Sequence, residues 1–147
     1  MNRSFKYLLI SAIFFSTQVL LSAADFDGDG EKITENTVLS LLEGLQSENM
    51  GLKTSSAYML GELRIEEAII PLMRMLKDSE SEEERISAAL ALYKIETPLS
   101  INAVKRAGEF DDSQRVSKLA TNFYNQYLRN KQRNDDSFTD STYVSLK

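Results

Sequence analysis

The chain has 147 residues and a formal net charge of −5, and it contains no Cys, His or Trp. These absences exclude a disulfide scaffold, thiolate catalysis, a Cys/His zinc site and every His-based catalytic triad. The chain contains only 2 Pro and 6 Gly, and 42% of its residues are hydrophobic. This composition favours a globular helical chain. An acidic chain repels phosphate backbones and anionic lipid surfaces, so we expect no nucleic-acid partner.

Residues 1–24 have the three parts of an export signal. A basic start precedes the compact apolar stretch Leu8–Phe15, and the small residues Ser22-Ala23-Ala24 predict cleavage before Asp25. A membrane anchor needs about 20 mostly apolar residues, and three polar residues interrupt this run. We therefore expect an exported protein, periplasmic or secreted, with no stable membrane anchor after cleavage. A signal retained as an anchor is the alternative.

Residues 25–34 are predicted to form an acidic linker that keeps the cleavage site accessible. Asp25, Asp27 and Asp29 also match the opening of a calcium loop, which places oxygen ligands at positions 1, 3 and 5 and Gly at position 6. The bidentate Glu of position 12 is replaced by Asn36, so this motif is incomplete. A weak calcium site, which would make the protein calcium-responsive, is the alternative to the plain linker.

Six short helices are predicted between Thr34 and Arg129 because apolar residues recur there with a period of about 3.6 residues. Asn49 and Thr97 are candidate N-caps, and Pro71 predicts a kink or a late helix start. The last 17 residues, 131–147, are polar and aperiodic, and we expect a disordered C-terminal tail. The predicted helices cover about 35–46, 50–63, 66–77, 82–96, 98–108 and 111–130.

The predicted helices repeat in pairs. The first helices of successive pairs match with a period of about 31 residues, Val38, Leu41, Leu42 and Leu45 corresponding to Ile69, Leu72, Met73 and Leu76. The second helices match in the same way, one residue further apart: Lys53, Ala57, Leu60 and Leu63 correspond to Arg85, Ala89, Leu92 and Ile95. A third copy is fainter. Two helices per repeat are typical of an α-solenoid, so the sequence predicts an all-α chain of about three antiparallel helix pairs.

The segments 68–78 and 85–95 resemble the first and second helices of a short HEAT-like repeat, and 57–63 repeats the second helix with the family's Gly at position 61. The resemblance covers residues 35–130. It implies a solenoid whose second helices line a concave, partner-binding side. Tyr93 stands where the family usually has Gly.

The same resemblance suggests partner-binding residues on the second helices: Lys53, Tyr58, Arg85, Tyr93 and Tyr124. Tyrosines there can anchor a partner, since aromatic side chains supply contact area at low entropic cost, or they can pack between repeats. The two cations have a competing structural role, because in this family they usually pair with an acid in a neighbouring turn, such as Asp78.

These observations predict a non-catalytic exported module that binds or scaffolds another protein. The adjacent acids 82–84 point in different directions on a helix and do not form an acid–base pair, so we expect no enzyme activity. Because some HEAT-like repeats occur in phycobiliprotein lyases, chromophore handling is an alternative, disfavoured by the export signal and the absence of His and Cys. We expect no cofactor other than calcium at the acidic segment.

Overall fold

The computed structural model describes the backbone of residues 34–144 and the side chains of residues 34–134. The predicted signal peptide, most of the linker and the three candidate calcium ligands lie outside the described residues. Within them the prediction of an all-α chain is confirmed, and the elements are α2 (Glu35–Gly44), α3 (Met50–Glu62), the 3₁₀ turn η1 (Glu66–Ala68), α4 (Ile69–Asp78), α5 (Glu82–Ile95), α6 (Pro98–Phe110) and α7 (Gln114–Val144).

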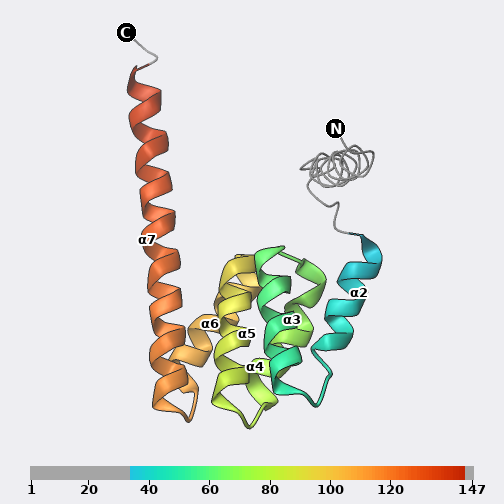
Figure 1. The fold of residues 1–147 in the computed structure, drawn as a ribbon. Coiled ribbons are helices and arrows are strands. Elements are labelled where there is room, and N and C mark those ends of the chain that lie inside the picture. Colours follow the sequence, from blue (N-terminus) through green and yellow to red (C-terminus); the bar gives the residue numbers. More distant parts are fainter. Residues whose placement is uncertain (1–33, 145–147) are drawn as a thin grey trace, which may run out of the picture. The chain divides into compact units, whose positions relative to one another are not determined.

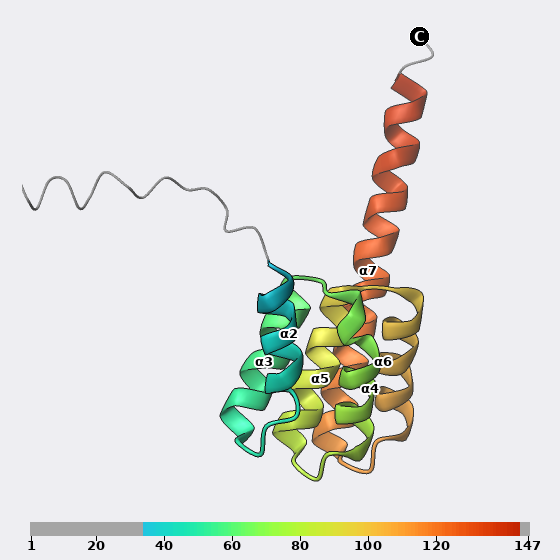
Figure 2. The same ribbon diagram turned by 90° about the vertical axis from the view of Figure 1, so that its right-hand side faces the viewer.

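The helices pack as alternating members of two layers. Helices α2, α4 and α6 belong to one layer and α3, α5 and α7 to the other. Each first-layer helix packs against the second-layer helix that follows it, and α5 is central, because it packs against α3, α4, α6 and α7. Figure 2 shows α2 and α3 at one side of this arrangement, α4 and α5 in the middle, and α6 at the other side.

The core is built from the repeated apolar positions. Leu60 of α3 and Leu92 of α5, which occupy matching positions one repeat apart, are both completely buried. Leu72 of α4, Val104 of α6 and Val116 of α7 are completely buried as well, so all helices except α2 contribute a fully buried aliphatic side chain. Because a helix cannot bury its apolar stripe without a neighbour, the layers depend on one another for stability.

Both predicted N-caps are confirmed. The Asn49 Oδ1 accepts a hydrogen bond from the backbone N–H of Leu52 at 3.0 Å, and the Thr97 Oγ1 accepts one from Ser100 at 3.2 Å. Pro71 is the third residue of α4, so its missing N–H falls where helical N–H groups have no intrahelical acceptor. The late start predicted at this proline is therefore confirmed, and η1 takes up the preceding residues.

The predicted end of the last helix near Asn130 is wrong. Helix α7 has 31 residues and continues to Val144, through most of the segment that we expected to be a disordered tail. Residues 131–144 carry no apolar period, but they contain neither Pro nor Gly, so nothing in them stops a helix. Figure 1 shows α7, in orange and red, as the longest helix. None of the helices within residues 34–144 is both long and apolar enough to cross a bilayer.

Candidate functional site

Two of the predicted binding residues, Lys53 and Arg85, take part in ion pairs between helices. The Lys53 Nζ lies 3.2 Å from the Glu84 Oε2 on α5. The Arg85 Nε and Nη2 donate to the two carboxylate oxygens of Asp111 at 3.1 and 3.2 Å. Both cations therefore pair with acids, as the structural alternative predicted, and Asp111 lies in a neighbouring turn. Asp78, which was given as an example, is the partner of neither; each cation reaches an acid that is distant in the sequence and brought close by packing.

Arg85 also binds the turn between α4 and α5. Its Nη1 donates to the carbonyl oxygens of Ser79 and Glu80 at 2.8 and 3.2 Å. The side chains of Arg85 and Asp111 are only 14% and 9% exposed. A guanidinium with this many short, charge-assisted hydrogen bonds holds two turns together and has little capacity left for a partner.

Tyr58 is the most accessible of the predicted tyrosines, with 47% of its surface exposed. The Lys94 Nζ of α5 lies 5.6 Å from its ring centroid and 2.6 Å from the Glu62 Oε1. A hydrogen bond with the Glu62 carboxylate raises the pKa of Tyr58, and hydrogen bonds from Lys94 and then Tyr58 lower the pKa of Glu62. We call Tyr58, Glu62 and Lys94 the Tyr58 cluster; its contacts hold an exposed aromatic ring in one orientation.

Tyr93 and Tyr124 are half-buried and pack between helices. The ring of Tyr93 stacks on that of Phe123 with centroids 5.8 Å apart and planes inclined by 16°. The Asn130 Nδ2 lies 3.5 Å from the Tyr93 hydroxyl, and the Lys105 Nζ of α6 lies 5.9 Å from the centre of the Tyr124 ring. Both tyrosines therefore serve the α5–α7 and α6–α7 contacts.

The three tyrosines also occupy different positions of the repeat. Tyr124 stands in the register of the buried Leu92 of the preceding repeat, and Tyr93 stands in the register of Gly61. Tyr58 belongs to a third register. The three tyrosines therefore do not form a single row across the second helices. Among them, Tyr58 is exposed, whereas Tyr93 and Tyr124 are half-buried.

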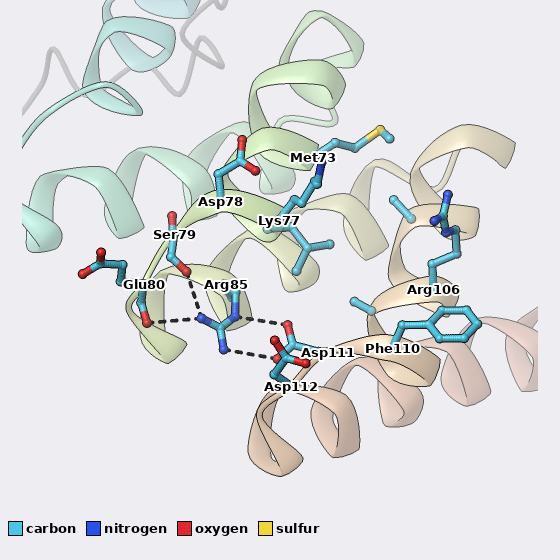
Figure 3. Close-up of a pocket in the computed structure, with 13 residues that line it drawn as sticks. Met73, Lys77, Asp78, Ser79, Glu80, Arg85, Arg106, Phe110, Asp111 and Asp112 are labelled. Carbon is cyan, nitrogen blue, oxygen red and sulfur yellow. Dashed lines mark hydrogen bonds and ion pairs between the residues drawn. The ribbon is translucent and has the colours of Figure 1, made fainter.

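A groove that was not predicted lies between α4 and α6 (Figure 3). Its volume is about 650 Å³, and it is lined by residues of both helices, by the turns that follow them, and by the predicted binding residue Arg85 of α5. The small side chains Ala103 and Ala107 face Met73 and Leu76 across it. Phe110, at the end of α6, lines the groove while 73% exposed, the largest value among the exposed large hydrophobic side chains of the described residues.

Charges of both signs surround the apolar part of the groove. Lys77 and Arg106 are exposed cations, and within residues 34–134 neither has an acid within ion-pair distance. Figure 3 shows Asp78 and Glu80 toward one end and Arg106 toward the other, while Asp112 follows α6. A groove that combines apolar side chains with cations and acids fits a polypeptide segment that carries apolar and charged side chains.

The sequence held a signal for this groove. Ala103 and Ala107 are four residues apart, so they share one face of α6 and leave space beside any neighbouring helix. Phe110 follows on the same face and ends the helix, where little is left to cover it. The sequence did not show that α4 lies opposite this face of α6.

The described residues contain no cluster of three or more acidic side chains that could hold a metal ion. Asp25, Asp27 and Asp29 lie outside them, so the calcium site stays a prediction. Neither the protein-family models nor the curated proteins provide a match to this chain.

Proposed function

We propose that the protein is a non-catalytic, exported protein-binding module built as a short HEAT-like α-solenoid of three antiparallel helix pairs. Support for the solenoid comes from the alternation of two helix layers and from the repeated burial of matching positions, such as Leu60 and Leu92. Stacked helix pairs present extended surfaces to partners. Export rests on the signal peptide predicted for residues 1–24.

The groove between α4 and α6 is the observation that carries the binding function. It combines apolar lining side chains, the exposed ring of Phe110 and the cations Lys77 and Arg106, which have no acidic partner in the described part of the chain. An exposed aromatic beside a hollow is typical of residues that dominate binding energy. A peptide segment from another protein fills such a groove with apolar side chains and pairs its charges at the rim.

The Tyr58 cluster provides a second contact surface on the other layer of helices. Its ring is exposed and held in place by neighbouring charges, so it loses little conformational freedom on binding. Lys53, Tyr93 and Tyr124 contribute to binding through the stability and orientation of the helices that carry the two surfaces. Arg85 lines the groove itself and fixes Asp111 in its wall.

Affinity capture from the envelope fraction of the native host tests the proposal. The bait is the chain from residue 25 onward, which contains the whole helical unit. Parallel baits carry Phe110→Ala in the groove, Tyr58→Ala in the cluster, and Leu128→Ala as a control, because Leu128 is 44% exposed on α7 outside both surfaces. Thermal melts confirm that each variant is folded.

The expected result is a protein retained by the parent and the Leu128 variant and lost with the Phe110 variant. Loss with the Tyr58 variant as well would extend the interface to the second surface. If no protein is retained, or if retention is the same with Phe110 and Tyr58 both replaced, the binding-module proposal is wrong.

A further inference from the structure

The charged side chains that line the groove divide into a paired and an unpaired set. The Arg85 guanidinium donates to both carboxylate oxygens of Asp111 at 3.1 and 3.2 Å, so these two charges neutralise each other within the wall. The remaining charged side chains of the lining are exposed, and within residues 34–134 none of them forms an ion pair. They are two cations and three acids: Lys77, Arg106, Asp78, Glu80 and Asp112. The groove therefore offers charges of both signs to a ligand.

The unpaired cations and acids are not mixed evenly along the groove. Arg106 lies within α6, one helical turn before Phe110, whereas Asp112 follows the end of this helix. Asp78 is the last residue of α4, and Glu80 belongs to the turn after it. Figure 3 shows the same division, with Asp78 and Glu80 toward one end of the groove and Arg106 toward the other. We call the part lined by Asp78, Glu80 and Asp112 the acidic end and the part at Arg106 the basic end.

The acidic end is strengthened by the helices that lead into it. Both α4 and α6 end there, and the last carbonyl groups of a helix, which have no intrahelical donors, carry a partial negative charge. Lys77 in the last turn of α4 offsets part of this charge. Three unpaired carboxylates against this one cation still leave negative charge in excess. A cation of a ligand is therefore favoured at the acidic end, and a carboxylate is favoured at Arg106.

The lining between the two ends is apolar. Ala103 and Ala107 are small side chains opposite Met73 and Leu76, and the ring of Phe110 is exposed beside them. An apolar side chain seated on Phe110 is removed from water together with part of the ring, which favours binding. A segment that entered in the opposite direction would place its acid and its base beside like charges, which costs affinity. The groove thus discriminates between the two directions of one sequence.

We propose that the groove binds a segment of a partner protein in which an apolar anchor residue stands between an acidic and a basic residue. The acid of the segment lies at Arg106, and its base lies at the acidic end. This inference rests on the proposed function and specifies what the partner's segment carries. A segment that is only apolar, or only charged, lacks one of the two contributions to affinity and binds more weakly.

Selection from a library of random linear peptides displayed on phage tests the proposal. The target is the protein purified after expression of the full chain, and a parallel selection uses its Phe110→Ala variant. The expected result is a set of peptides that the parent retains and the variant loses. These peptides should share an apolar residue with an acid on one side and a base on the other, always in the same order along the peptide.

The affinity of one selected peptide, labelled with a fluorophore, then checks each end of the groove separately. Arg106→Glu should weaken binding by about threefold to tenfold, because an attractive pair becomes a repulsive one, and replacing the acid of the peptide by Lys should restore it. Asp112→Lys should act in the same way on the base of the peptide, with Glu in its place restoring the affinity. Lys118→Glu is the matched control, since Lys118 is an exposed cation of α7 outside the groove. All three side chains are exposed, so the variants remain folded, which thermal melts verify.

The outcomes separate this inference from the proposed function. Peptides that need Phe110 but share no order of acid and base, or that bind equally well to the Arg106 and Asp112 variants, overturn the inference and leave the groove as a binding surface. If no selected peptide depends on Phe110, the groove does not bind linear segments and the inference is wrong; the capture experiment then decides the proposed function independently. Self-association of the protein that Phe110→Ala abolishes would identify a second copy as the occupant and would also overturn the inference.

Discussion

Replacing Gly61 by Ala tests the contact between α3 and α5 directly. A Cβ at this position would lie 2.7 Å from the Cα, 3.0 Å from the Cβ and 3.2 Å from the carbonyl oxygen of Ala91. Two of these are backbone atoms, so the clash is relieved only if the two helices move apart. Gly→Ala inside a helix otherwise stabilises it by about 0.5–1 kcal/mol, and overpacking a close contact costs about 1–3 kcal/mol.

Gly51 provides the matched control in the same helix. It is exposed, and a Cβ there would meet only the Oδ1 of Asn49 at 3.2 Å, which is the N-cap acceptor of Leu52 on an exposed side chain; a shift of a few tenths of an ångström relieves this contact and keeps the N-cap hydrogen bond. We expect Gly51→Ala to be neutral or to stabilise the fold by up to about 1 kcal/mol. The Gly61→Ala variant should then unfold with a free energy lower than that of Gly51→Ala by about 1–3 kcal/mol.

Equilibrium unfolding in urea measures this difference, with equal slopes for the two variants showing that the same surface is exposed on unfolding. A Gly61→Ala variant as stable as Gly51→Ala would mean that α3 and α5 do not approach each other at Ala91. The second layer would then pack differently from the arrangement described above.

Two further predictions concern the charged contacts. Arg85→Ala leaves the nearly buried Asp111 without its cation and should cost about 3–5 kcal/mol in urea unfolding. Arg115→Ala, which removes the exposed ion pairs with Glu82 and Glu83, should cost far less, and equal losses would show that the Arg85 contacts are not formed. In the folded protein the hydrogen bond from Lys94 lowers the pKa of Glu62. The contribution of the Glu62 carboxylate to stability is therefore present at neutral pH and is lost as the pH falls through that pKa. Glu62→Gln should lower the pKa of Tyr58 toward 10.0, measured by NMR of ring-labelled tyrosine, and an unchanged midpoint would show that the hydrogen bond between them is absent.

The helices were predictable because local physics specifies them. Periodic apolar residues, the N-caps Asn49 and Thr97 and the proline at position 71 act within a few residues of where they stand, and the structure confirms them. The predicted end of helix α7 came too early because the prediction required an apolar period. Past Asn130 that period is absent, yet no residue there breaks a helix.

The contacts between helices were less predictable, since they depend on which distant residues packing brings together. The structural alternative for Arg85 was an acid in a neighbouring turn, and the structure supplies one; the example given was Asp78, seven residues before Arg85, whereas the partner is Asp111, 26 residues after it. The groove likewise requires Phe110 and Met73 to face the same space from two helices. Sequence offsets reveal which positions are equivalent, and only the three-dimensional arrangement reveals which of them meet.

Tyr93 illustrates how a departure from the repeat acquires a physical reason. The small pair Gly61–Ala91 between α3 and α5 corresponds to the large pair Tyr93–Phe123 between α5 and α7. Both residues of the second pair are larger than their counterparts. Two stacked rings therefore fill the contact between α5 and α7, whereas backbone atoms fill the equivalent contact between α3 and α5. Tyr93→Gly alone should therefore leave the Phe123 ring without its stacking partner. In urea unfolding, the additional change Phe123→Ala should cost less in that background than in the parent chain, since the two side chains stabilise the fold through one shared contact; strictly additive costs would show that the rings act independently.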